Sequence, residues 1–183
     1  MKQGIKIFLI TILLAAILIG AYFAYDKLKS STPSTDTAVS QNGQSETAAD
    51  FTAITENGDE VKLSDYFGKP VIVNFWATWC GYCVHEMPLF ESAYKEYGED
   101  INFIMLNLTD MDRETVESAK QFISENGYTF PVLFDAKQDA LNAYETYSIP
   151  VTLFINSDGT IYDKQIGALD ENTLNENINA ILK

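Results

Sequence analysis

Hydrophobic and polar positions divide the chain into three zones. Residues 7–25 form an apolar run without a charged side chain. Residues 30–49 are rich in serine and threonine and hold too few apolar side chains to build a core. Residues 50–183 alternate short apolar runs with amphipathic stretches, as a folded domain does. We therefore predict a membrane anchor over 1–29, a flexible linker over 30–49 and one globular domain over 50–183.

The first apolar run is long enough to cross a membrane. As a helix rising about 1.5 Å per residue, residues 7–25 nearly span a hydrocarbon core of ~30 Å. A cleaved signal peptide and a buried helix are the alternatives. Cleavage after Ala24 would place bulky Tyr22 where a small residue is needed, and so uniform a helix does not suit a small domain. The sequence therefore favours an uncleaved, single-pass anchor.

Within the domain, apolar β-branched runs predict strands, and apolar residues at three- and four-residue steps predict helices. The predicted strands cover residues 51–54, 60–63, 71–76, 101–108, 129–135, 151–156 and 160–166. The predicted helices start at Cys80, cover 112–126 and 138–147, and close the chain around Leu174, Ile178 and Ile181. This order predicts an α/β fold with a mixed central sheet flanked by helices.

Charge and cysteine content narrow the function. The chain carries 12 Lys or Arg against 26 Asp or Glu, a formal net charge of −14 at pH 7. Nucleic-acid binding needs basic side chains to replace counterions, so this balance argues against nucleic acid as a partner. Two cysteines are too few for a disulfide framework, so the domain depends on its hydrophobic core.

The stretch "WATWCGYCVHEMP" gathers both cysteines, both tryptophans and the only histidine of the chain. Cys80 and Cys83 follow a predicted strand and open a predicted helix. Unpaired N–H groups and the positive end of the helix dipole stabilise a thiolate there, which lowers the thiol pKa from about 8.5. Such a pair can attack a disulfide, pass through a mixed disulfide and resolve it internally.

Other uses of a Cys-x-x-Cys pair fit less well. Covalent haem attachment needs a histidine directly after the second cysteine, where Val84 stands, and His85 comes one position late. A zinc site needs four ligands, more than two cysteines and one histidine supply. An inert disulfide closing so small a loop stabilises the fold little. We predict redox chemistry with no metal and no cofactor; His85 is expected at the surface, or else as a modulator of the thiolate.

The segment "VIVNFWATWCGYCVHEMP" resembles the active site of the TlpA/ResA-like membrane-anchored thiol-disulfide oxidoreductases of the thioredoxin superfamily. The lead-in "LSDYFGKP" and the later "SIPVTLFIN" and "DGTI" extend this resemblance over the whole domain. The resemblance implies a thioredoxin-like fold, and residues 112–126 resemble the inserted helix of the TlpA-like branch. The predicted anchor and linker also match the layout of that family.

The resemblance implies catalytic roles. Cys80 would be the attacking thiolate and Cys83 the resolving thiol. Asn74 stands where thioredoxin has a buried aspartate, and because an amide cannot accept a proton, Glu86 is the better candidate base. The alternative for Glu86 is a charge on a solvated helix face.

The resemblance also implies a substrate-binding set. Pro150 matches the loop proline that lies, as a cis residue, against the cysteine pair. The backbone of Ile149 would hydrogen-bond an extended substrate segment in the manner of an added strand. Trp79, Gly81 and Tyr82, which flank the cysteines, complete the predicted set.

The function implied is an extracytoplasmic reductase of disulfides in exported proteins, apocytochrome c among them, supplied with electrons by a CcdA-like integral-membrane partner. A dithiol domain has a clear use outside the cytosol, where disulfides form. One alternative is a disulfide-forming oxidase, and another is a non-catalytic module that binds exported chains. A peroxiredoxin-type peroxidase would need threonine where Ala77 stands.

Overall fold

The computed structural model describes residues 46–110 and 112–183, so the predicted anchor and residues 30–45 of the predicted linker lie outside the described residues. The strands within this part are β1 (Thr52–Ile54), β2 (Glu60–Lys62), β3 (Val71–Trp76), β4 (Asn102–Asn107), β5 (Val132–Phe134), β6 (Val151–Ile155) and β7 (Ile161–Ile166). The helices are η1 (Leu63–Tyr66, a 3-10 helix), α2 (Gly81–Tyr97), α3 (Val116–Asn126), α4 (Asp139–Ala143) and α5 (Glu171–Ile181). Each predicted strand segment contains an observed strand.

The strands form one mixed sheet in the order β2-β1-β5-β4-β3-β6-β7. The central strand β3 runs parallel to β4 and antiparallel to β6, with Trp76 opposite Asn107 and Phe75 opposite Val151. This mixed α/β arrangement confirms the predicted fold class. It also places the ends of β3 and β4 beside the start of β6, and the cysteine pair follows directly after β3.

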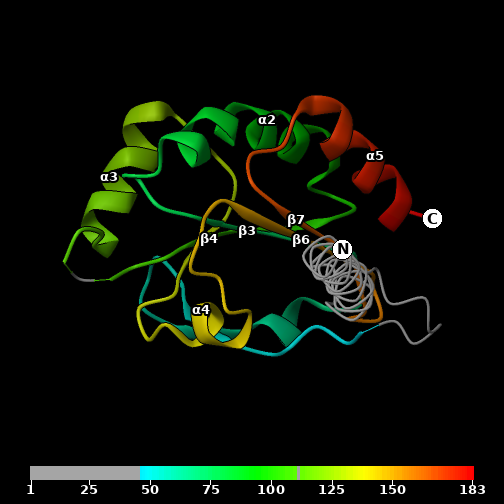
Figure 1. The fold of residues 1–183 in the computed structure, drawn as a ribbon, viewed down its shortest axis with the longest axis horizontal. Coiled ribbons are helices and arrows are strands. Elements are labelled where there is room, and N and C mark those ends of the chain that lie inside the picture. Colours follow the sequence, from blue (N-terminus) through cyan, green and yellow to red (C-terminus); the bar gives the residue numbers. More distant parts are fainter. Residues whose placement is uncertain (1–45, 111) are drawn as a thin grey trace, which may run out of the picture. The chain divides into compact units, whose positions relative to one another are not determined.

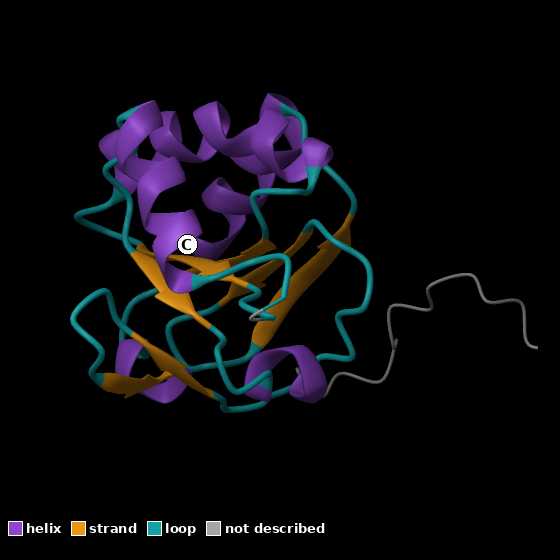
Figure 2. Ribbon diagram, turned by 90° about the vertical axis from the view of Figure 1, so that its left-hand side faces the viewer, coloured by secondary structure: helices purple, strands orange, loops and turns teal. Residues whose placement is uncertain are grey.

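Helices cover both faces of the sheet (Figures 1 and 2). On one face lie α2, α3 and α5; on the other lie α4 and η1. All six residues of β3 are buried. Ile72 and Trp76 pack on the α2 side with Met87, whereas Val73 and Phe75 pack on the opposite side. Side chains that alternate between two apolar layers hold this strand, and hence the segment after it, firmly in place.

Two helices are shorter than predicted. Helix α3 begins at Val116 rather than at residue 112, because the Asp110 carboxylate accepts hydrogen bonds from the N–H groups of Arg113 and Glu114 and holds a turn there. Helix α4 covers only Asp139–Ala143, and Glu145 adopts a left-handed φ of 50° that ends any continuation. Both boundaries depend on capping that apolar periodicity does not reveal.

The folded part begins before Asp50, the predicted start of the domain. The Ala48 N–H donates to the Gly159 carbonyl oxygen over 2.8 Å, and the Ile161 N–H donates to the Glu46 carbonyl oxygen over 2.8 Å. Ala48 is buried against the core on the α4 side. Residues 46–48, within the predicted linker range, are therefore paired with the β6–β7 hairpin.

Among the helices of residues 46–110 and 112–183, none combines the length and apolarity needed to cross a membrane.

Candidate active site

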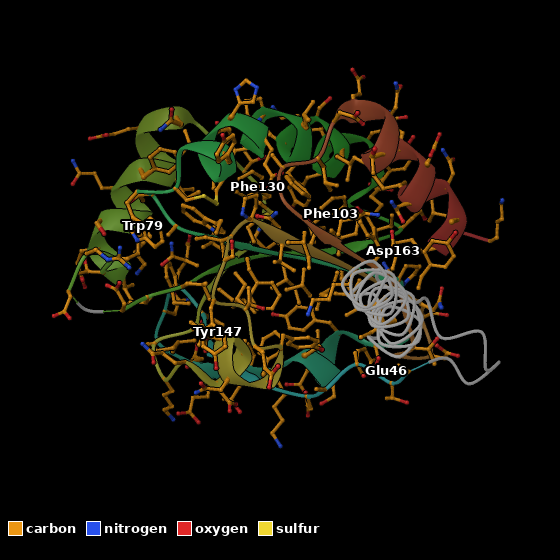
Figure 3. All side chains as sticks on the ribbon, viewed as in Figure 1. Glu46, Trp79, Phe103, Phe130, Tyr147 and Asp163 are labelled. Carbon is orange, nitrogen blue, oxygen red and sulfur yellow. A yellow bond between two sulfur atoms is a disulfide. The ribbon has the colours of Figure 1, made fainter. Side chains whose placement is uncertain are left out.

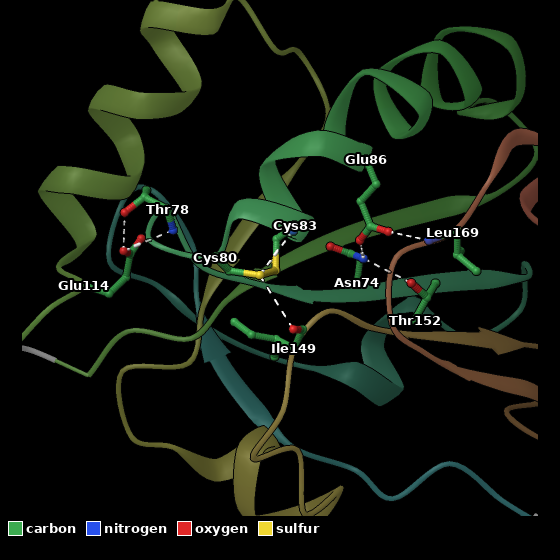
Figure 4. Close-up of a disulfide and its surroundings, with 9 residues drawn as sticks. All are labelled: Asn74, Thr78, Cys80, Cys83, Glu86, Glu114, Ile149, Thr152 and Leu169. Atoms are coloured by element: carbon green, nitrogen blue, oxygen red, sulfur yellow. Dashed lines mark hydrogen bonds between the residues drawn. A yellow bond between two sulfur atoms is a disulfide. The ribbon is translucent and has the colours of Figure 1, made fainter.

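Cys80 and Cys83 form a disulfide at the junction of β3 and α2 (Figure 4). Their Cα atoms lie 5.3 Å apart. Cys80 is the N-cap residue of α2, and its sulfur accepts a hydrogen bond from the Cys83 N–H over 3.2 Å. In the reduced protein this N–H and the helix dipole would stabilise a Cys80 thiolate. The predicted strand–Cys-x-x-Cys–helix arrangement is present.

The two cysteines differ in exposure. Cys80 retains 6% of its surface, whereas Cys83 retains none and belongs to the core around Met87 and Phe90. A partner sulfur can therefore approach Cys80 but not Cys83. This difference agrees with the role of attacking residue expected for Cys80.

The loop before β6 brings Ile149 and Pro150 to the disulfide. The Ile149–Pro150 peptide bond is cis, as expected from the resemblance. The Ile149 carbonyl oxygen lies 3.7 Å from the Cys80 sulfur. Pro150 is buried, and its carbonyl oxygen accepts from the Gly167 N–H over 2.9 Å. The β3–β6 pairing thus joins residues that are 69 positions apart in sequence.

Aromatic side chains surround this point. Trp79 and Tyr82 are 46% and 74% exposed, and Gly81 between the cysteines is also exposed. Tyr147, which the sequence analysis did not select, is 77% exposed and lies toward the same end of the domain as Trp79 (Figure 3). Trp79, Tyr147 and Ile149 line one pocket of about 270 Å³. Exposed aromatic rings beside a backbone edge suit contact with a polypeptide.

Glu86 is buried, with 1% of its surface exposed, so it is not a charge on a solvated helix face. Its carboxylate accepts from the Asn74 amide nitrogen over 2.8 Å and from the Leu169 N–H over 2.8 Å. Burial raises the pKa of Glu86, and these two hydrogen bonds offset only part of that effect. A carboxyl group with a raised pKa, three residues after Cys83 on the same helix, is suited to proton exchange.

Asn74 connects Glu86 to the sheet. Its amide nitrogen also donates to the Thr152 hydroxyl over 3.0 Å, while its Oδ1 is buried without a hydrogen-bond partner. No hydrogen bond between Glu86 and either sulfur is found in the described part of the chain. Within these residues, Glu86 is therefore bonded to Asn74 and Leu169 rather than directly to the cysteine pair.

His85, the remaining residue with a predicted position, is exposed on α2, in agreement with a surface position. Within residues 46–110 and 112–183, no group of three or more His, Cys, Asp or Glu side chains is placed to hold a metal ion.

Two neighbours of the site were missed by sequence reasoning. The Arg113 guanidinium lies 4.3 Å from the centre of the Trp79 ring, and the Glu114 carboxylate is bonded to Thr78. Both come from the turn before α3, more than 30 positions after the residues they contact. One signal was available, since Arg113 is the only arginine in the sequence.

Comparisons with known proteins agree with this geometry. A sequence profile of the AhpC/TSA family matches residues 45–164. The thioredoxin-like protein YneN of Bacillus subtilis is 34% identical over 139 residues, which cover 75% of this chain and 79% of that protein. The thiol-disulfide oxidoreductase ResA of Geobacillus kaustophilus is 32% identical over 136 residues, which cover 74% and 76% respectively.

Solved structures give the same result for the fold. StoA from Bacillus subtilis superposes with a TM-score of 0.62 at 27% identity, covering 72% of this chain and 97% of that structure. The exposed lipoprotein thioredoxin Etrx1 of Streptococcus pneumoniae superposes with a TM-score of 0.63 at 28% identity, covering 72% of this chain and 99% of that structure. The thioredoxin-like fold is thereby confirmed. With a disulfide that caps α2, a cis proline beside it and ResA matched over 76% of its length, the chain belongs to the ResA-like thiol-disulfide oxidoreductases of the thioredoxin superfamily.

Proposed function

We propose that this thiol-disulfide oxidoreductase works as a reductase of disulfides in exported proteins, tethered to the membrane by residues 1–29 with its domain on the extracytoplasmic side. The observation that carries the proposal is the position of Cys80. It caps α2, keeps the only exposed surface of the pair and lies 3.7 Å from the Ile149 carbonyl oxygen. A client chain bonded to that loop would present its disulfide to this sulfur.

The reaction proceeds in two exchanges. The Cys80 thiolate attacks one sulfur of the client disulfide, which forms a Cys80–client disulfide and releases the second client sulfur as a thiolate. Cys83 then loses its proton and attacks the Cys80 sulfur, which releases the first client sulfur as a thiolate. Two electrons pass to the client, and the protein ends as the Cys80–Cys83 disulfide seen in the structure. Glu86, on the same face of α2 as Cys83, is the acceptor proposed for the Cys83 proton.

The charge around the pair favours the reducing direction. A strong oxidant needs a greatly stabilised thiolate. Glu86 accepts hydrogen bonds only from neutral groups, so its negative charge, where present, opposes a nearby thiolate. The Arg113 guanidinium is the nearby cation, but Asp110 pairs with it at 3.4 Å. The net effect leaves the thiolate only mildly stabilised.

Each turnover requires two electrons to reopen the Cys80–Cys83 disulfide. A domain held at the membrane surface is well placed to take them from an integral-membrane dithiol donor, and a CcdA-like protein is the class implied by the family resemblance. Apocytochrome c and other exported proteins with exposed disulfides are the proposed clients. The acidic chain, with a net charge of −14, favours such partners over nucleic acid.

The test is reduction of insulin by the full-length chain with dithiothreitol as the electron source. We expect catalysis by the wild-type chain and none by Cys80→Ser. A non-catalytic binding module would show no catalysis in either protein. Rapid oxidation of a reduced client by the Cys80–Cys83 disulfide, without insulin reduction, would instead support the oxidase alternative.

A further inference from the structure

A second buried carboxylate lies close to the redox pair and has no part in the exchange chemistry. Glu114 is fully buried in the turn before α3. Its Oε2 accepts from both the N–H and the hydroxyl of Thr78, over 3.2 and 2.5 Å (Figure 4). Its Oε1 accepts from the Asn107 amide nitrogen over 2.8 Å. Burying a carboxylate costs free energy unless the group is well hydrogen-bonded, and these three bonds supply the partners that Glu114 needs.

The segment that Glu114 holds is the one that leads into the active site. Thr78 directly precedes Trp79, and Cys80 follows. Neither Thr78 nor Trp79 belongs to β3 or α2, so the strand and helix ladders do not fix them. In the described residues, the bonds from Glu114 are the side-chain bonds made to Thr78. The turn that contains Thr78 and Trp79 is otherwise closed by one backbone bond, from the Cys80 N–H to the Ala77 carbonyl oxygen over 3.1 Å, so loss of the Glu114 bonds would leave this turn without its side-chain anchor.

The residue before Glu114 covers the Trp79 ring. The Arg113 guanidinium lies 4.3 Å from the ring centre, within the range of a cation–π contact. The Asp110 carboxylate holds Arg113 by its N–H over 2.7 Å and by its Nε over 3.4 Å. Glu114 thus holds the backbone beside Trp79, and its neighbour Arg113 covers one face of the Trp79 ring.

We propose that Glu114 is a positioning residue for client binding: its bonds to Thr78, together with Arg113 on the indole, set Trp79 in the wall of the pocket that Ile149 also lines. The proposal deepens the proposed function, because it concerns the client that the redox pair reduces. Trp79 and Ile149 line the same pocket, and Trp79 keeps 46% of its surface for a client. The Trp79 ring is therefore already ordered when a client chain binds, which lowers the entropy cost of binding.

The domain contains a matched control for this contact. Glu91, on α2, is also a buried carboxylate, and it accepts from both the N–H and the hydroxyl of Thr129 over 2.8 Å each. This pair ties α2 to the segment before β5 and does not touch the pocket beside Trp79. Thr129→Val and Glu91→Ala therefore remove the same kind of bond from the same domain without disturbing Trp79.

Two measurements on the full-length chain in detergent test the proposal. Acrylamide quenching reports Trp79 alone, because Trp76 is fully buried. We expect Thr78→Val and Glu114→Ala to increase quenching, whereas Thr78→Ser, which keeps both donors to Glu114, should retain wild-type quenching. In insulin reduction, we expect Thr78→Val to lower kcat/KM roughly tenfold, mainly by raising KM, because the client then meets an unfixed ring. Thr129→Val and Glu91→Ala should stay at the wild-type values in both measurements.

Wild-type quenching and wild-type KM in Thr78→Val would overturn the proposal, and so would an equal change in Thr129→Val, which would indicate general loosening. If Glu114→Ala does not fold, Thr78→Val still decides. If the wild-type chain reduces no insulin, the proposed function fails, while quenching continues to test whether Glu114 positions Trp79.

Discussion

The carboxylate of Glu86 lies 2.8 Å from the amide nitrogen of Asn74, in a region of the core that water does not reach. Asn74 occupies the centre of β3, and Glu86 lies three residues after Cys83 on α2. The pair therefore holds a carboxyl group on the helix that carries the buried cysteine without exposing that group to solvent.

This burial predicts a specific dependence of stability on pH. Burial raises the pKa of Glu86 in the folded state above its ordinary value near 4.5. The contribution of Glu86 to the free energy of unfolding is therefore complete below this ordinary pKa, and it is lost as the pH rises through the folded-state pKa. We expect Glu86→Gln to remove this loss, so the stability of the variant relative to wild type should increase from pH 4 to pH 8. Urea unfolding at several pH values measures the difference.

Glu91→Gln is the matched control for that titration. Burial alone would raise the Glu91 pKa, but the hydrogen bonds from Thr129 and Lys95 outweigh it and lower the pKa. Its stabilising effect is therefore present above the ordinary pKa and lost as pH falls. The two variants should change in opposite directions with pH, and parallel curves would contradict the assignment of Glu86.

Glu86 should also influence turnover. As the proposed acceptor of the Cys83 proton, it should couple to the thiol titration. We expect Glu86→Gln to slow insulin reduction by roughly tenfold or more, as loss of a general base does, and to simplify the pH–rate profile. Stopped-flow reduction across pH 5–9 measures this. An unchanged profile would leave Glu86 with a structural role only.

The cysteines should differ sharply in reactivity. Cys80 caps α2 and is 6% exposed, whereas Cys83 is fully buried. In the reduced protein we expect iodoacetamide to alkylate Cys80 first, by a factor of at least about ten, because only this thiol is both reachable and stabilised as thiolate. Peptide mass spectrometry after timed quenching identifies the modified residue. Cys83→Ser should accumulate mixed disulfides with clients, and faster labelling of Cys83 would reverse the assigned roles.

The reduction potential decides the direction of electron flow. With Glu86 near the pair and Arg113 paired to Asp110, we expect a value nearer that of thioredoxin, about −270 mV, than that of DsbA, about −120 mV. Equilibration with dithiothreitol and glutathione buffers measures it. A value more oxidising than about −180 mV, in the region of protein disulfide isomerase, would favour the oxidase.

Topology can be tested by proteolysis of intact cells. Because residues 46–48 are paired with the β6–β7 hairpin, we expect external protease to cut within 30–45 and to release the domain intact. The N-terminus of the released fragment, read by mass spectrometry, locates the cut. A domain that stays protected until the membrane is breached would place it on the cytoplasmic side.

Local patterns were sufficient for the strands and the redox pair. The run Val71–Trp76 predicts a strand because its side chains, apart from Asn74, are apolar and several are β-branched. The observed strand β3 has the same bounds. Cys80 and Pro150 were identified through short motifs, since their neighbours in sequence carry the signal.

The long-range contacts had to come from the tertiary structure. Helical periodicity left Glu86 open to a solvated position, and it is buried because Leu169, 83 positions away, closes over it and donates its N–H. The bond between Glu114 and Thr78 and the stack of Arg113 on Trp79 also join separate segments, which no repeat of 2 or 3.6 residues encodes. The sequence by itself determined which residues carry the chemistry and which elements hold them. Only the packing of distant segments decided which polar groups are buried, and therefore which of them can exchange protons or position a client.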